Sequence, residues 1–354
     1  MVRWRSGVVS SVGRRWRGVV TLDVSVGPST VRALAYPALT GEPVAGDRVL
    51  LNVGALEMGL GTGGFALVVA LPDRLPPDPP VPASRDSGHL VKARYTPLQA
   101  IVLGVDEEAS PHRAVMESVD SVDGMPVVVA DLHSALPAIL AGVGPELSVA
   151  YVMTDGGALP AWFSRTLDGL RGHLAGTVTV GQSFGGDLEA TTVHSGLLAA
   201  RHVLHADVTV VTQGPGNLGT GTAWGFSGVA AGEAVNAAAV LGGRPVASLR
   251  LSDADPRARH RGISHHSLTA YGRVALAPAD VVVPAPPPPF VEGTLAELAS
   301  RHRIVHVPVE GLEAALKVSP VPLSTMGRGL EADPWYFLAA AAAGRHAAAL
   351  TRSG

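Results

Sequence analysis

Hydrophobic positions in the first 71 residues alternate with polar ones in short runs, which turn residues separate. The runs lie at 19–26, 30–35, 47–53 and 64–71, with Gly, Pro, Asn and Asp between them. Short alternating runs with such breaks are typical of strands joined by tight turns. This part of the chain is therefore predicted to form a small β domain, either a barrel or a sandwich.

Continuous apolar runs alternate with helix-like stretches from about residue 89 onward. Strands buried on both faces read as unbroken Val, Ile and Thr runs, and helices between them indicate a covered parallel sheet. Uneven unit lengths favour an open, doubly wound sheet over a closed eight-stranded barrel. Strands are predicted at 100–105, 125–130, 147–153, 177–180, 208–212, 245–251, 280–283 and 304–307, and helices around Ala114, Ala135, Trp162, Val193, Gly232, Thr269, Leu298 and Ala315.

Prolines cluster between the two patterns, at 76, 77, 79, 80 and 82, which is typical of a stiff linker. The fold class predicted is therefore α/β, a mostly parallel sheet preceded by a barrel-like β domain. We expect the β domain at 1–71, the linker at 72–88 and the α/β domain at 89–354. A terminal helix is expected from Asp333, because Pro334 suits a first helical turn.

Polar residues follow nearly every predicted strand of the α/β domain. Because the carboxyl ends of parallel strands share one edge, these residues are expected to converge on a crevice. The alternative is that they only cap helices and form turns. In strand order they are Asp106, Glu107, Glu108, Ser110 and His112; Asp131, His133 and Ser134; Thr154 and Asp155; Gln182, Ser183 and Asp187; Gln213 and Asn217; and Ser252, Asp253, Arg259, Arg261, Ser264, His265 and His266.

Two glycine-rich loops, 181–187 and 213–222, follow strands of this predicted sheet. Backbone N–H groups in such loops can hold a phosphate or carboxylate, although close packing of helix on strand explains the glycines equally well. The second loop also fits G-x-G-x-x-G, but its glycines continue beyond the motif, which argues against a dinucleotide. The ligand-binding candidates are Gly185, Gly186, Asp187, Gly214, Gly216, Asn217 and Thr220.

The segment 181–185 matches the G-x-S-x-G nucleophile elbow, which suggests a serine hydrolase as an alternative function. Ser183 would be the nucleophile, and Asp253 with His265 or His266 would follow in the usual order. Asp253 lies only a dozen residues before His265, which is a short separation for two strand-end loops. A plain turn or a ligand-cradling loop is the preferred interpretation.

Histidines and carboxylates at the strand ends supply the acid–base candidates, which are His133, Asp155 and His265. The residue types that could ligate zinc or another divalent metal are present in His133, His194, His265 and His266 with Asp131, Asp155, Asp187 or Glu189. No local pair such as H-E-x-x-H supports such a site, so no metal ligand is predicted and the cofactor stays unknown. Arg259, Arg261 and Arg328 are candidates for pairing with an anion.

Composition narrows the function classes. The chain has no cysteine, which excludes disulfides, thiolate catalysis and iron–sulfur clusters. The net charge of −3 gives no general attraction to nucleic acid or anionic lipid. Arg3, Arg5, Arg14, Arg15 and Arg17 with Trp4 and Trp16 could hold single strands, but a solvated strand face is favoured.

Partners and location follow from the same composition. No signal peptide or membrane-length apolar run is present, so a cytoplasmic protein with no membrane partner is expected. Nucleic acid is not an expected partner, and self-association is left open.

Several strings of the chain resemble one bacterial family known only as a domain of unknown function. The resemblance spans nearly the whole chain and implies no activity, cofactor or catalytic residue. The strings are RYTPLQ at 94–99, GMPVVV at 124–129, DLHS at 131–134, GGDLE at 185–189, QGPG at 213–216, GTGT at 219–222 and GISHHS at 262–267.

The function predicted from these patterns is binding of a small anionic metabolite at the carboxyl edge of the sheet, with its turnover left open. The alternatives are a serine hydrolase that uses Ser183 and a non-enzymatic sensor or nucleic-acid adaptor. Whether the chain is an enzyme is not decided by its sequence.

Overall fold

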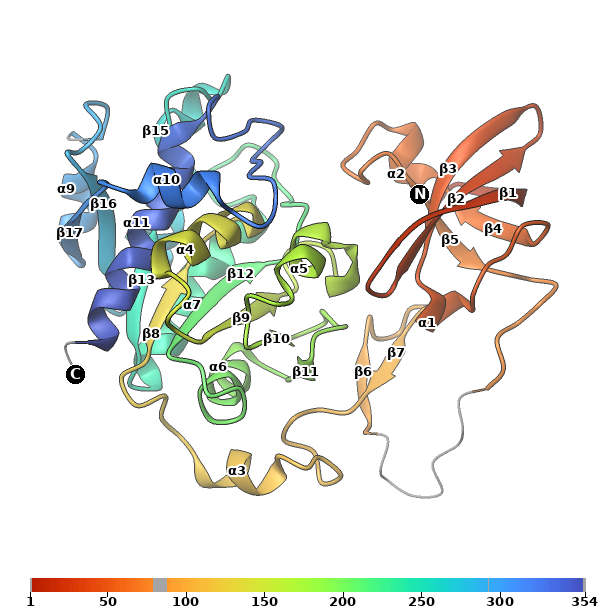
Figure 1. The fold of residues 1–354 in the computed structure, drawn as a ribbon, viewed down its shortest axis with the longest axis horizontal. Coiled ribbons are helices and arrows are strands. Elements are labelled where there is room, and N and C mark those ends of the chain that lie inside the picture. The colour runs from red at the N-terminus through yellow and green to blue at the C-terminus, as the bar shows by residue number, and fades with distance from the viewer. Residues whose placement is uncertain (1, 79–87, 292, 353–354) are drawn as a thin grey trace. The chain divides into compact units, whose positions relative to one another are not determined.

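The computed structural model describes residues 2–78, 88–291 and 293–352, which divide into two compact units (Figure 1). One unit comprises Met1–Ser87 and Val91–Ile101, and the other comprises Gly88–Leu90 and Val102–Gly354. The linker predicted at 72–88 lies partly outside the described residues. The domain boundaries at 71 and 88 therefore stay predictions.

The first unit contains a closed five-stranded barrel, which confirms the barrel-like domain. Its strand order is β1-β2-β3-β5-β4, and β3 and β5 pair in parallel. Inward-facing Val9, Leu22, Leu51 and Val68 fill its core. Its elements are β1 (Trp4–Trp16), β2 (Val19–Val26), β3 (Ser29–Ala35), α1 (Pro37–Thr40), β4 (Arg48–Asn52), α2 (Gly54–Glu57) and β5 (Ala66–Ala70).

Strand β1 is the one barrel strand that the hydrophobic pattern missed. Only Gly7 and Val9 of its 13 residues are buried, so the strand shows no apolar alternation to detect. It pairs with both β2 and β4 and thereby closes the barrel. Gly7 is required there, because a Cβ at this position would lie 2.6 Å from the carbonyl oxygen of Ser25.

The second unit is built on an eight-stranded parallel sheet in the order β11-β10-β9-β12-β8-β13-β16-β17. The open order excludes the closed eight-stranded alternative and confirms the α/β fold. The strands are β8 (Pro126–Val129), β9 (Val149–Thr154), β10 (Gly176–Thr179), β11 (Leu188–Glu189), β12 (Val208–Gln213), β13 (Arg244–Ser248), β16 (Asp280–Ala285) and β17 (Arg303–Pro308). The pairs β6 (Leu90–Lys92) with β7 (Ala100–Val102) and β14 (Leu251–Ser252) with β15 (Gly262–Ile263) lie outside this sheet.

Helices cover both faces of the sheet (Figure 1). Alternate residues of β8 enter opposite cores, since Val127 packs in one apolar cluster and Val128 in the other. Helices α6 and α7 contribute to the first cluster, and α4 and α11 to the second. The helices are α3 (Arg113–Ser118), α4 (Leu136–Val143), α5 (Arg165–Leu170), α6 (Val193–His202), α7 (Ala230–Val240), α8 (His265–Thr269), α9 (Leu295–Ala299), α10 (Leu312–Lys317) and α11 (Pro334–Thr351), with short turns η2 (His133–Ala135), η3 (Ala161–Phe163), η4 (Ser227–Val229), η5 (Ala258–His260) and η6 (Ala270–Val274).

The strand predicted at 100–105 is wrong as a member of the large sheet. Residues 100–102 form β7, which pairs with β6, and only Gly104 makes an isolated bridge to Glu189 at the sheet's edge. The Glu107 carboxylate accepts the N–H groups of Gly104 and His89, so the chain turns here instead of extending. The polar residues at 106–112 therefore do not follow a strand of the sheet, and β11 is the eighth strand.

Helices α4 and α11 approach each other so closely that glycine is required on both. A Cβ on Gly142 would lie 1.8 Å from the carbonyl oxygen of Ala341, and one on Gly344 would lie 2.0 Å from that of Ile139. These neighbours are backbone atoms, which cannot move aside to make room for a methyl group as the end of a flexible side chain can. The alanine-rich face of α11 and these glycines thus allow a terminal helix to lie directly against α4.

Gly344→Ala should lower the free energy of unfolding by roughly 1–3 kcal/mol, because the added methyl group overpacks the α4–α11 contact. Chemical denaturation of the purified variant measures the change. Gly172→Ala is the matched control, since a Cβ there meets nothing within 4 Å. Equal stability of the two variants would contradict the packing argument.

One charge cluster joins the amino ends of β16 and β17 to α11. The Asp280 carboxylate accepts hydrogen bonds from His346 at 2.7 Å and from Arg303 at 2.6 Å. Burial would raise the pKa of Asp280, but these two hydrogen bonds outweigh it and lower the pKa to about 2. The ionised form is therefore favoured in the folded chain.

Asp280→Asn should lower the free energy of unfolding at pH 7 by roughly 1–2 kcal/mol, with allowance for the exposed Arg303. Because the folded pKa is lowered, the contribution is complete above about pH 4 and is lost as pH falls toward 2. Denaturation curves of both proteins should converge over that range. Glu313→Gln, which breaks an exposed pair with Lys317, is the control and should change little.

Candidate functional site

The chain reverses its direction of winding between the neighbouring strands β8 and β12. It leaves β8 through α4 on one face toward β9, and leaves β12 through α7 on the other face toward β13. Ligands of open α/β sheets bind beyond the carboxyl ends of strands at such a switch point. Asp131 follows β8 at this place, and Gln213 ends β12.

Two buried side chains at this switch point carry polar atoms without a hydrogen-bond partner. The Gln213 amide nitrogen donates to the Asp131 carbonyl oxygen and to Asn217 Oδ1, both at 2.7 Å. Gln213 Oε1 and Asp131 Oδ2 have no partner among the described residues. The small cavity beneath them has room for about one water molecule. Buried polar atoms are normally satisfied, so unpaired ones at a switch point indicate a ligand site.

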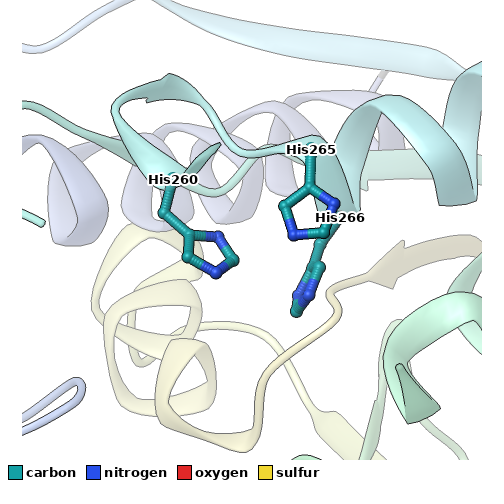
Figure 2. A group of neighbouring side chains, drawn as sticks. All are labelled: His260, His265 and His266. Atoms are coloured by element: carbon teal, nitrogen blue, oxygen red, sulfur yellow. The ribbon is translucent and has the colours of Figure 1, made fainter. Parts of the chain in front are cut away.

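Three histidines from the loop after β13 face this point. His260 ends η5, and His265 and His266 begin α8 (Figure 2). One ring nitrogen from each lies within 4.8 Å of the others, and Figure 2 shows the three rings gathered around one space. We call residues 252–266 the histidine loop.

Ser264 positions these histidines. Its hydroxyl oxygen accepts the His266 N–H at 3.2 Å, which caps α8, and lies 2.7 Å from His260 Nδ1. The Phe226 ring stacks on His266 with centroids 3.8 Å apart and 2° between the planes. A helix cap, a hydroxyl contact and a stacked ring therefore hold two of the three imidazoles in place.

Asp131 and His266 connect the histidine loop to the switch point. Asp131 Oδ2 lies 3.4 Å from His266 Nδ1, but neither atom has a hydrogen-bond partner in the described chain. His265 Nε2 is unpartnered as well. These atoms are held near one another without satisfying one another.

Burial and nearby positive charges disfavour the charged forms of His260 and His265. Burial lowers the pKa of His260 to about 3, and the charges of Arg250 and Arg257 add to the effect. Burial also lowers the pKa of His265 to about 4, with further contributions from His266 and Arg259. Neutral imidazoles each offer one nitrogen lone pair to a ligand.

A buried network of charges anchors the base of the histidine loop. The fully buried Asp255 carboxylate accepts hydrogen bonds from Arg257 at 2.8 Å, Arg328 at 3.1 Å and Arg250 at 3.3 Å. Burial would raise the pKa of Asp255, but the hydrogen bonds from Arg257 outweigh it and lower the pKa well below its usual range. Asp333 accepts from Arg328 and Ser252, which ties the loop to the start of α11.

The structure gathers only part of the predicted site. It brings His265, His266 and Asp131 together, and adds His260, which the sequence analysis passed over. The spacing H-x4-H-H after a strand would have been the signal for this residue. Asp253 and His194 are exposed, and His194 lies at the start of α6.

His133 lies buried within the fold. Its ring nitrogens contact the Tyr151 hydroxyl at 2.9 Å and the Ser164 hydroxyl at 2.7 Å. Burial lowers its pKa to about 4. Both ring nitrogens are engaged by protein groups, so its predicted acid–base role gains no support.

Ser183 is fully buried, and its hydroxyl donates to the carbonyl oxygens of Val180 and Met153 at 2.7 and 2.9 Å. Its turn leads into the short strand β11 rather than directly into a helix. Asp155 is exposed, and its carboxylate accepts the Gln182 N–H at 2.8 Å, which braces the same turn. The serine-hydrolase alternative gains no support from this geometry.

Most of the predicted anion donors are already in use. The N–H groups of Gly185, Gly186 and Gly214 donate to Glu189, Thr179 and Thr154. The Asp187 carboxylate accepts the Thr177 N–H. These residues close the turns around their own strands. Of the predicted ligand-binding residues, Gly216 and its neighbours Asn217 and Thr220 remain.

Residues 213–225, here the glycine-rich loop, extend from the end of β12. Asn217 Oδ1 accepts from Gln213 and Ser227, while Thr220 and Gly225 close its exposed tip with a 2.7 Å hydrogen bond. Gly216 has φ of +91° and open space where a Cβ would stand. The Arg259 guanidinium lies over the loop, with its Cζ 3.5 Å from the Cβ position of Gly221.

The arginines of the barrel unit mostly pair with acids of the same unit. Arg3 and Arg5 contact Glu57, and Arg15 contacts Glu42. Small five-stranded barrels include oligonucleotide-binding domains, but paired arginines leave less charge for phosphates.

No helix within the described ranges is long and apolar enough to cross a lipid bilayer.

The chain belongs to the DUF3866 family, a family described as a protein of unknown function, whose model matches residues 32–344. The match spans both units and confirms the family resemblance. No curated protein matches the chain. The family's description assigns no activity to its members.

Asp255→Asn should destabilise the protein by about 3 kcal/mol and loosen the histidine loop, because it leaves the buried Arg250 without its carboxylate. Hydrogen–deuterium exchange of residues 252–266 measures the loosening. Asp253→Asn removes an exposed neighbouring charge and is the control. Unchanged exchange in Asp255→Asn would show that the network does not hold the loop.

Proposed function

We propose that this protein binds a small anionic molecule at the switch point, between the glycine-rich loop and the histidine loop. The observation that carries the proposal is the state of Arg259. Its side chain is exposed and forms no ion pair or hydrogen bond within the described chain, yet it lies against Gly221. An arginine at the edge of a ligand crevice is suited to a carboxylate or phosphate.

The surroundings of Arg259 favour a negative ligand. The glycine-rich loop contains no charged residue, so no carboxylate on it competes for the guanidinium. Its charge also reaches the crevice, because Arg259 contributes to the lowered pKa of His265. A ligand held by Arg259 would therefore lie close to the histidines.

The glycine-rich loop adds backbone donors to this charge. The N–H groups of Gly216 and Asn217 donate to no group among the residues that the structure describes. No side chain shields Gly216, so a ligand oxygen can approach the peptide closely. The predicted candidates Gly216, Asn217 and Thr220 are thus retained in the proposal, whereas Gly185, Gly186 and Asp187 are not.

Anion binding is tested by thermal denaturation of the full chain with inorganic phosphate, AMP, glucose 6-phosphate and malonate. A ligand at 100 times its Kd stabilises the folded state by about 2.7 kcal/mol, so the melting temperature should rise by several degrees for at least one compound. Arg259→Gln should lose most of that rise. Arg171→Gln, an exposed arginine on another part of the unit, should keep it.

Two outcomes would overturn the proposal. The first is no concentration-dependent rise with any of the four compounds. The second is an equal rise in the wild type and in Arg259→Gln, which would place the anion elsewhere.

A further inference from the structure

We infer that His260, His265, His266 and Asp131 form a binding site for a divalent transition-metal ion of the zinc class. The inference goes beyond anion binding and does not depend on it. It starts from where the unsatisfied atoms of the protein lie. Six buried side-chain atoms lack a hydrogen-bond partner in the described chain, and four of them belong to Asp131 and Gln213 at the switch point and to His265 and His266 of the histidine loop.

The chemistry of these four atoms indicates a cation. A carboxylate oxygen, an amide oxygen and two imidazole nitrogens can all donate an electron pair. His260 adds a third imidazole nitrogen of this kind, which lies within 4.8 Å of one on His265 and one on His266. A crevice lined by electron-pair donors without protons is completed by a metal ion rather than by another acceptor.

The distances fit one ion. Two atoms bound to one tetrahedral zinc lie about 3.3–3.4 Å apart when the bonds are about 2.0–2.1 Å. Asp131 Oδ2 and His266 Nδ1 are separated by 3.4 Å. The three histidine nitrogens lie within 4.8 Å of one another, so small side-chain rotations bring them onto the same centre.

The surrounding contacts are those that metal-binding histidines usually have. His260 Nδ1 contacts the Ser264 hydroxyl, which leaves its Nε2 for the ion. The Phe226 ring fixes the plane of His266. The Gln213 amide nitrogen donates to the Asp131 carbonyl oxygen, which fixes the backbone that carries the carboxylate.

A hydrogen-bonded His266–Asp131 pair with a purely structural role would explain fewer of these features than a metal ion does. Such a pair would place the His266 N–H on Asp131 at a normal hydrogen-bond distance, about 2.7–3.2 Å, instead of 3.4 Å. It would also leave His265 Nε2 unsatisfied and give no reason for His260 to face the other two rings. One metal ion accounts for all of these features.

The donor set also restricts which metal would bind. Three imidazoles and one carboxylate suit zinc, iron, nickel or copper, whereas magnesium and calcium prefer oxygen ligands. The chain contains no cysteine, so no thiolate can serve as a metal ligand. Gln213 Oε1 is a further unpartnered oxygen at the end of β12, the strand next to β8.

The test is direct metal binding by the full chain, stripped with a chelator and studied in a chloride buffer without other anionic ligands. Calorimetric titration with Zn²⁺ should show one ion per chain, and Co²⁺ should give visible d–d bands typical of a low-coordinate nitrogen–oxygen site. His265→Ala should weaken zinc binding by more than about 100-fold, since even outer partners of metal ligands are worth 10–100-fold. His194→Ala, an exposed histidine of the same unit, should bind as the wild type does.

Further measurements keep the outcome interpretable. Circular dichroism in chelator shows whether His265→Ala is folded, and Asp131→Asn provides a second variant with nearly unchanged shape. Arg259→Gln should retain full zinc binding while losing the anion response, so the two proposals can fail separately. The inference is overturned if the wild type binds no stoichiometric Zn²⁺ or Co²⁺, or if His265→Ala and His194→Ala bind equally.

Discussion

The insertion of β12 between β8 and β9 decides where the polar groups of this protein meet. Strands β8 and β9 follow each other in the chain but are not neighbours in the sheet, so their connection must pass β12 on one face. The connection from β12 to β13 passes β8 on the other face. In open α/β sheets, crossings on opposite faces of two neighbouring strands leave the position at which ligands bind. At this point Asp131 and Gln213, which are 82 residues apart in the chain, are hydrogen-bonded through the Gln213 amide nitrogen and the Asp131 carbonyl oxygen.

The histidine loop is placed by buried charge rather than by the sheet. Between β14 and β15 the backbone has little regular structure, yet Asp255 receives three guanidinium groups there. Buried ions are stable only when paired, so each broken contact would leave an uncompensated charge. The network therefore restricts the loop to few conformations, and Ser264 and Phe226 then orient the rings that the loop carries.

The sequence predicts the sheet well because strands buried on both faces form unbroken apolar runs, as in 208–212. It does not predict the lateral order, since a local run carries no information about its neighbour. The pattern misses strand β1 because only Gly7 and Val9 of its residues are buried, and it wrongly assigns residues 100–105 to the sheet although Glu107 turns the chain. Within the site, His265 and His266 were recognised from their place after a strand. His260 was not, because its convergence with them depends on the folded loop.

The charges around the crevice connect the two proposed ligands. Imidazole binds a metal in its neutral form and adds no charge to the centre, and Asp131 is the single carboxylate of the inferred metal site. A divalent ion held by one carboxylate stays positive overall, and Arg259 lies close enough to affect His265. Both charges would attract an anion to the same space, whereas a carboxylate-rich metal site would repel it. The ratio of imidazoles to carboxylates thus favours a metal ion and a negative ligand together at this edge of the sheet.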